Sequence, residues 1–333
     1  MNSTEMQFIA DQFSIPVDLI ERAIHSGMIV PVSDKPPYRF SDTEIELWFG
    51  WGEPLAVAFR ERLRRDAKNE LLGDFYAPGK YVQKNEYILP FKECWFVIDG
   101  GCARNREGFI TSFHYYMAPP TRWALDFVII HPDDYFKCSS EMDNDSIFTF
   151  RMRRHQEMGK PDYHDTKPWS KNQVFEILNP EAQNPQDHFC YEMDIIAPAD
   201  GLILSRQGPG NDSRFHHIVK RARELGDDRE VGFLIDHGNR EISQFAHLLA
   251  REMMVRPGDQ VEQGQLIGKA GAKHHHLPHL HWSVWDTWHP LFALGLPIMI
   301  SSCEIWTDSS FVRQDNAWLT KGMLVRNGSG FHS

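Results

Sequence analysis

The chain has 333 residues, of which 41% are hydrophobic, and this is typical of a globular protein with room for two domains. Its formal charge of −11 argues against a general binder of polyanions. The cysteines are widely spaced and form no Cys-x-x-Cys pair, which excludes an obvious disulfide framework or thiolate zinc site: Cys94, Cys102, Cys138, Cys190 and Cys303.

The start of the chain, MNSTEMQFIADQF, lacks the basic and apolar regions of a signal peptide. The late apolar stretch PLFALGLPIMISS is too short to span a bilayer and is broken by Pro297. We therefore expect a soluble, cytoplasmic protein without a membrane partner.

Residues 1–65 are predicted to form a small helical domain. The segment SIPVDLIERAIHSG has apolar residues at helical spacing between Pro16 and Gly27. Ser41 and Glu44 have the spacing of a capping box, which predicts the start of a further helix. The stretch MIVPVSDKPPYRF between these helices is predicted to be extended.

The order helix, turn, helix, wing, helix resembles the N-terminal half of MerR-type winged helix-turn-helix domains. These domains often carry a Tyr-Arg pair just before a capped helix, which is Tyr38-Arg39 in this sequence. The resemblance covers about 45 residues and implies docking to DNA or protein. Acidic residues outnumber Lys and Arg between Met1 and Trp48, whereas phosphate contact needs cations. A helical packing or oligomerisation module is the alternative.

The rest of the chain is predicted to be mostly β-structure. Residues 66–88 carry scattered charge and turn residues and are predicted to be a connector. From residue 89 onward, short apolar runs such as CWFVIDGG, VGFLIDHGN and ISQFAHLL alternate with turn residues. The predicted fold is therefore α+β, with a mainly antiparallel β domain at 89–333 that contains a charged insertion at 131–186.

The stretch KHHHLPHLHWSVWD puts five histidines into eight positions. In a strand, His279 and His281 would share one face, while Leu280 and Trp282 would share the other. One imidazole could then bind a metal beside the second. A catalytic zinc usually takes three protein ligands and a water, so the other ligands must come from elsewhere in the chain. A solvated histidine surface is the alternative.

Several ordered motifs resemble the core of the LytM/lysostaphin-like zinc metallopeptidases. Upstream of them, DIIAPADGLIL resembles the family's strand-turn-strand, and FHYYMAPPTRWALDF resembles one form of its zinc motif. The core motifs are DHG at 236–238, FAHL at 245–248, GD at 258–259, GQLIG at 264–268 and PHLHW at 278–282. The resemblance implies a lysostaphin-like β metallopeptidase domain.

Carried over to this sequence, the resemblance implies that zinc is held by His114, Asp126 and His281. It implies that His247 and His279 are two further, catalytic histidines. Two imidazoles and a carboxylate would leave zinc an open position for a water of lowered pKa. The two catalytic histidines would move its proton and bond the developing oxyanion, and which does which stays open.

The chain departs from the family pattern at two places. The compact form of the family has three residues between the first His and the Asp, whereas His114 and Asp126 are twelve residues apart. His131 is the alternative to His114 as a ligand. His274–His276 occupy a loop where the family usually has Gly, Ser and Thr, and a solvated surface, a substrate groove and adventitious metal binding are the alternatives there.

Three more residues near these motifs are predicted to have structural roles. We expect Asp236 and His237 to form a hydrogen-bonded turn pair at a strand end. We expect Arg122 to lie in a surface ion pair, with contact to a substrate carboxylate as the alternative.

The function that these patterns predict is a zinc-dependent endopeptidase, acting by a zinc-activated water. The resemblance implies peptidoglycan stem peptides or cross-bridges as substrates. The alternative is a non-catalytic metallopeptidase-like binding or regulatory protein, whose N-terminal module docks to protein or DNA. The oligomeric state is not predicted.

Overall fold

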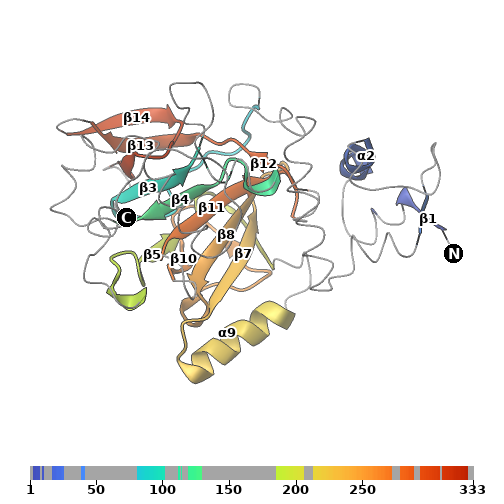
Figure 1. Cartoon of the computed structure of the whole chain (residues 1–333), viewed down its shortest axis with the longest axis horizontal. Coiled ribbons are helices and arrows are strands. Elements are labelled where there is room, and N and C mark those ends of the chain that lie inside the picture. Colours follow the sequence, from blue (N-terminus) through green and yellow to red (C-terminus); the bar gives the residue numbers. More distant parts are fainter. Residues whose placement is uncertain are drawn as a thin grey trace, which may run out of the picture.

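The computed structural model describes residues 3–7, 10, 17–25, 39–41, 81–101, 112, 114, 119–129, 185–205, 213–271, 278–288, 293–307 and 310–328. Most of these residues belong to an antiparallel β fold, with helix α9 (Ser213–Leu225) at one end of the molecule (Figure 1). This confirms the predicted fold class. No helix in these ranges is long and apolar enough to cross a membrane.

One large sheet and one small sheet make up the body of the fold. The large sheet contains β3 (Trp95–Gly100), β4 (Leu125–Val128), β6 (Gly201–Ser205), β7 (Glu230–Asp236), β8 (Ile242–Leu249), β9 (Gln260–Val261), β11 (Leu280–Trp285), β12 (Gly295–Leu296), β13 (Ile300–Trp306), β14 (Phe311–Ala317) and β15 (Leu324–Arg326). The small sheet pairs β5 (Asp194–Ile196) with β10 (Leu266–Lys269). Short 3-10 turns occur at η2 (Pro119–Thr121), η4 (Pro185–Asp187) and η5 (Ala250–Glu252).

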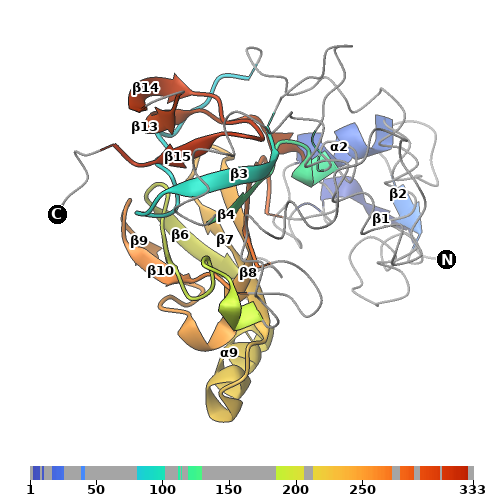
Figure 2. The same ribbon diagram turned by 60° about the vertical axis from the view of Figure 1, so that its left-hand side comes forward.

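The large sheet has the strand order β14-β13-β15-β3-β4-β11-β8-β7-β6-β9, with β12 paired to β11. Figure 2 shows β13, β14 and β15 at one end of the molecule and α9 at the other. The centre of the sheet is therefore built from chain segments that are far apart in sequence, because β3 and β4 come before the predicted insertion and β11 comes long after it.

The central strands β3, β4 and β11 are buried along their whole length. Strands covered on both faces read as nearly continuous apolar runs, and a polar residue within them needs a specific partner. Asp99, Asp126 and His281 are such residues, and each is at most 7% exposed. The core of the fold thus singles out the same strands that carry two of the predicted metal ligands.

The described part of the N-terminal segment is small. Helix α2 (Val17–His25) forms where the apolar spacing predicted a helix, and β1 (Ser3–Glu5) pairs with β2 (Arg39–Ser41). Ser41 ends β2, which is compatible with an N-cap, since an N-cap residue also has extended backbone. Glu44 and most of residues 1–65 lie outside the described ranges, so the helix after Ser41 and the domain boundaries stay predictions.

The segment that precedes β3 is attached to the large sheet through one buried acid. Glu241, which lies between β7 and β8, is fully buried. Its carboxylate accepts five hydrogen bonds from the side chains and backbone of residues 81–87, and the donors are the Tyr81 and Tyr87 hydroxyls, the Lys84 and Asn85 N–H groups and the Asn85 amide. The end of the predicted connector therefore packs as part of the β domain.

Replacement of this acid is expected to destabilise the fold. In Glu241→Ala, buried donors lose a charged acceptor, so the free energy of unfolding should fall by about 3 kcal/mol. Urea unfolding followed by tryptophan fluorescence measures the change. Glu262→Ala, at an exposed position, should alter the midpoint little. Equal midpoints for Glu241→Ala and wild type would contradict the proposed anchor.

Candidate functional site

The pairing of β4 with β11 places Asp126 directly opposite His281. Residues that face each other across an antiparallel pair point to the same side of the sheet. The Asp126 Oδ1 atom lies 2.8 Å from His281 Nδ1. Leu280 and Trp282 pack into the main core instead, as the alternation predicted. The strand register alone therefore brings one carboxylate and one imidazole together.

His114 completes this group from the chain that leads into β4. Its Nε2 atom lies 3.0 Å from Asp126 Oδ2, and its ring centroid is 4.9 Å from that of His281. The Thr121 hydroxyl, at the end of η2, donates a hydrogen bond to the His114 carbonyl. Within the twelve-residue gap, η2 is thus bonded to the backbone at His114. His131, the alternative ligand, lies outside the described residues.

The three side chains fit a single metal ion. Their ligand atoms all lie within 4.8 Å of one another, and all three residues are buried. Two ligand atoms on a tetrahedral zinc are roughly 3.3–3.5 Å apart. The contacts of 2.8 and 3.0 Å from Asp126 to His281 and His114 are slightly shorter than this, so a small outward shift would seat a cation. Two imidazoles and a carboxylate are also a donor set that suits zinc.

The other two histidines lie beside this group. His279 Nε2 is 3.5 Å from Asp126 Oδ2. The His247 ring centroid is 4.5 Å from that of His279 and 6.3 Å from that of His281. All five site residues predicted from the sequence therefore come together in one place, although the role of each stays a prediction.

The backbone of His247 is irregular. Between Val231 and Phe233 of β7 the register with β8 shifts, so that Gly232 faces two residues of β8, Ala246 and His247. His247 has a φ of 65°, in the left-handed region that a residue with a side chain rarely adopts. Such β-bulges re-aim side chains and are frequent next to active sites.

Gly271 is hydrogen-bonded to the backbone of His247. Its N–H donates to the His247 carbonyl at 2.7 Å, and a Cβ at this position would lie only 3.1 Å from the same oxygen. A glycine therefore allows the close approach that holds the bulge.

Two acids next to the site were not predicted from the sequence. A bulge in β3 shifts the register so that Asp99 faces Asp126, and Asp99 Oδ2 lies 3.8 Å from His114 Nε2. Glu230, the first residue of β7, lies 2.9 Å from His247 Nδ1 through Oε2. For Asp99, the sequence signal was an acid inside the apolar run CWFVIDGG. Glu230 begins a strand, where acids are usually solvated, so its sequence position gave no such signal.

His237 has a structural position, as predicted. Its Nδ1–H donates to the Asp200 carbonyl at 2.7 Å, so its Nε2 accepts the Ser243 hydroxyl, also at 2.7 Å. That hydroxyl oxygen in turn accepts from the Trp282 indole. Burial lowers the pKa of His237, although the Asp200 bond and nearby acids oppose this.

Two other predictions had a different outcome. Asp236 accepts a hydrogen bond from the Gly238 N–H, so it caps its own turn rather than pairing with the histidine. Arg122 was predicted to lie on the surface, and this is wrong, because it is 6% exposed between η2 and the buried strand β4. His274–His276 lie outside the described residues.

Comparison with known proteins supports the peptidase resemblance. Residues 191–292 match the model of Peptidase family M23. The match includes His247, His279 and His281 and begins after Asp126. It does not reach the N-terminal segment, so it gives no support to the winged-helix resemblance. A search of curated proteins gives no significant match.

Among solved structures, the chain is similar to M23 peptidases. The M23 metalloprotease pseudoalterin from the deep sea is 12% identical, with a TM-score of 0.28, over 72% of this chain and 96% of that one. A zinc-containing peptidase from Vibrio cholerae is 19% identical, with a TM-score of 0.20, over 36% and 35%. Lysostaphin is 24% identical, with a TM-score of 0.19, over 28% and 32%. In the first three structures that match, the region similar to this chain covers 37%, 54% and 32% of the other protein, which is less than two thirds of each.

The buried, neutral state of His237 predicts a pH-dependent stability. Because its pKa is lower in the folded than in the unfolded chain, its contribution is complete above the ordinary pKa of about 6.5 and is lost as the pH falls below it. Between pH ~7.5 and ~5.5, the free energy of unfolding should therefore fall more steeply for wild type than for His237→Asn, by up to about 1.4 kcal/mol per pH unit for one proton.

Urea unfolding at a series of pH values tests this. All other groups are the same in both proteins, so the difference between the two slopes isolates His237. Identical slopes would contradict the assignment of His237 as a buried neutral residue.

Proposed function

We propose that the chain is a zinc-dependent endopeptidase that hydrolyses a peptide bond with a water molecule. The observation that supports this most directly is the convergence of His114, Asp126 and His281, whose ligand atoms lie within 4.8 Å of one another, next to two further histidines. The match of residues 191–292 to a metallopeptidase family supports the reaction class independently. As substrates we propose peptidoglycan stem peptides or cross-bridges, which the sequence resemblance implies.

Asp126 contacts both of the imidazoles that would hold the ion with it. Asp126 presents one oxygen to His281 and the other to His114, so each imidazole is oriented by the same carboxylate. A zinc ion held there would polarise the peptide carbonyl and lower the pKa of a water molecule toward neutrality. The protein supplies the fixed geometry, because all three ligands are buried and two of them lie on paired strands.

The flanking histidines supply the proton transfers. Hydrolysis removes a proton from water and delivers one to the leaving amine. Of the described residues near the ligands, His247 and His279 are the imidazoles that are left to do this, with ring centroids 4.5 Å apart. His279 also faces Asp126 Oδ2, which orients its ring.

The first test of this function is metal binding. Purified wild-type protein, stripped with a chelator and reloaded, should bind about one zinc per chain, measured by elemental analysis and calorimetry. His281→Ala and Asp126→Ala should weaken zinc binding by more than about 100-fold, since each removes a direct ligand. His216→Ala, on the exposed side of α9, is the matched control and should bind as wild type does. Zinc binding that survives His281→Ala would exclude this site.

The second test is turnover. The zinc-loaded protein should release peptide fragments from a peptidoglycan digest or from a panel of stem peptides, detected by mass spectrometry. His247→Ala should keep its zinc but lose about 10²- to 10⁴-fold in kcat, because proton transfer is removed while the ligands stay. A protein that holds zinc and cleaves no peptide would favour a non-catalytic binding role instead.

A further inference from the structure

We propose that Glu230 is the positioning residue of His247: it accepts a hydrogen bond from the imidazole Nδ1–H, and Nε2 is then the ring nitrogen that takes part in the reaction. The catalytic meaning of this pair rests on the proposed peptidase function, whereas the pair itself does not. The Glu230 Oε2 atom lies 2.9 Å from His247 Nδ1. The two side chains are only 16% and 20% exposed, so they are more shielded from solvent than an ordinary surface ion pair.

The strand register explains why these two residues meet. Glu230 faces Leu249 directly, and His247 lies two positions before Leu249 on β8. Diagonal neighbours on one face of a sheet are within reach of long side chains. The bulge opposite Gly232 then sets His247 in its left-handed conformation, which turns it away from regular alternation. Glu230 therefore meets a histidine whose backbone is already constrained.

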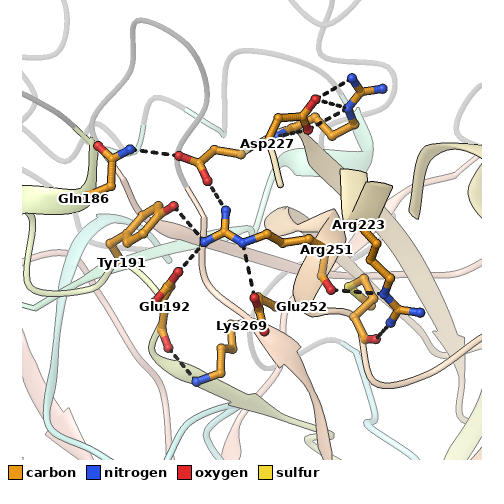
Figure 3. Close-up of polar contacts among 11 residues, drawn as sticks. Gln186, Tyr191, Glu192, Arg223, Asp227, Arg251, Glu252 and Lys269 are labelled. Atoms are coloured by element: carbon orange, nitrogen blue, oxygen red, sulfur yellow. Dashed lines mark hydrogen bonds and ion pairs between the residues drawn. The ribbon is translucent and has the colours of Figure 1, made fainter. Parts of the chain in front are cut away.

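A cluster of charged residues joins the chain just before Glu230 to the chain just after β8, the strand that carries His247 (Figure 3). The cluster centres on Arg251 of η5, just after β8, and Figure 3 shows its guanidinium surrounded by partners from three segments. Its contacts are to Asp228, Tyr191, Glu192 and Glu252.

Two further bonds strengthen the connection to β7. Gln186 donates to the second oxygen of Asp228 at 3.0 Å, and the Ala250 N–H donates to the Arg229 carbonyl at 3.0 Å. The residues immediately before Glu230 are thus tied to the residues that follow β8. This ties the start of β7, where Glu230 lies, to the strand that carries His247.

The chemistry of the pair defines the state of the imidazole. An ionised carboxylate only accepts hydrogen bonds, so the Nδ1 atom of His247 carries the proton and the Nε2 atom of the neutral ring is an acceptor. In the proposed reaction, a proton passes from water to Nε2, and the same proton then passes from Nε2 to the leaving amine nitrogen. The transient positive ring lies beside the Glu230 carboxylate, which stabilises it.

The first experiment tests the pair without any enzymatic assay. In the full chain labelled with ¹⁵N-histidine, two-bond ¹H–¹⁵N correlations report the tautomer of His247, identified by the signals that disappear in His247→Gln. Wild type should show the Nδ1–H form, and Glu230→Ala should shift the ring toward the Nε2–H form. Glu262→Gln, an exposed acid outside the site, should leave the tautomer unchanged. An unchanged His247 tautomer in Glu230→Ala would overturn the proposal.

The second experiment tests the effect on catalysis. Glu230→Gln should lower kcat about 10- to 100-fold, with KM and zinc content unchanged, because a misoriented imidazole slows proton transfer without altering binding. Glu230→Asp should recover part of the loss, and Glu262→Gln should keep full activity. A wild-type kcat in Glu230→Gln, or a loss that appears only in KM, would overturn the positioning role.

The two experiments separate the two proposals. If wild type cleaves no peptide but the tautomer responds to Glu230→Ala, the endopeptidase function fails and the pair stands. If wild type cleaves peptides and Glu230→Ala changes neither the tautomer nor kcat, the pair fails and the endopeptidase function stands.

Discussion

The candidate site depends on one cross-strand contact, the pairing of Asp126 on β4 with His281 on β11. Because side chains alternate along a strand, a slip of one residue would turn both groups to the opposite face of the sheet. The Asp126 carboxylate is fully buried, and an isolated buried charge is strongly unfavourable. Its contacts with the imidazoles of His114, His279 and His281 offset that cost and also create a donor set for a cation.

The strands next to this pair on either side are irregular at the positions where they contribute to the site. In β3, a bulge after Val97 brings Asp99 opposite Asp126, a position that Ile98 would occupy in a regular ladder. In β8, a bulge places two residues, Ala246 and His247, opposite the single residue Gly232 of β7. In a regular strand, alternate residues share one face. A bulge changes which residue faces the site, so one polar side chain can point there while the rest of the strand stays in the core.

The five predicted site residues were found from the spacing within one strand and from the family resemblance, whereas contacts that depend on distant pairing outside those motifs were not predicted. The alternation of His279, Leu280, His281 and Trp282 defines which side chains face the site. Glu241 shows the opposite case, since its partners lie 154–160 residues earlier in the chain. Neither bulge is visible in a period-two pattern, and Arg122 looked like a surface cation because its burial comes from tertiary packing.

The site is also assembled from two parts of the chain that differ in how they compare with known proteins. The matched segment, residues 191–292, supplies His281 and the two flanking histidines, whereas His114 and Asp126 come from before it. β4, which carries Asp126, lies between β3 and β11 in the sheet, and His114 comes before β4 in the chain, so two of the three candidate ligands come from chain that the matched segment does not contain. The contacts of residues 81–87 with Glu241 then attach this earlier part to the β7–β8 turn. A fragment limited to the matched residues would keep His247 and His279 but lack Asp126 and His114, so the proposed chemistry needs these earlier residues and the segment from residue 81 that is bonded to Glu241.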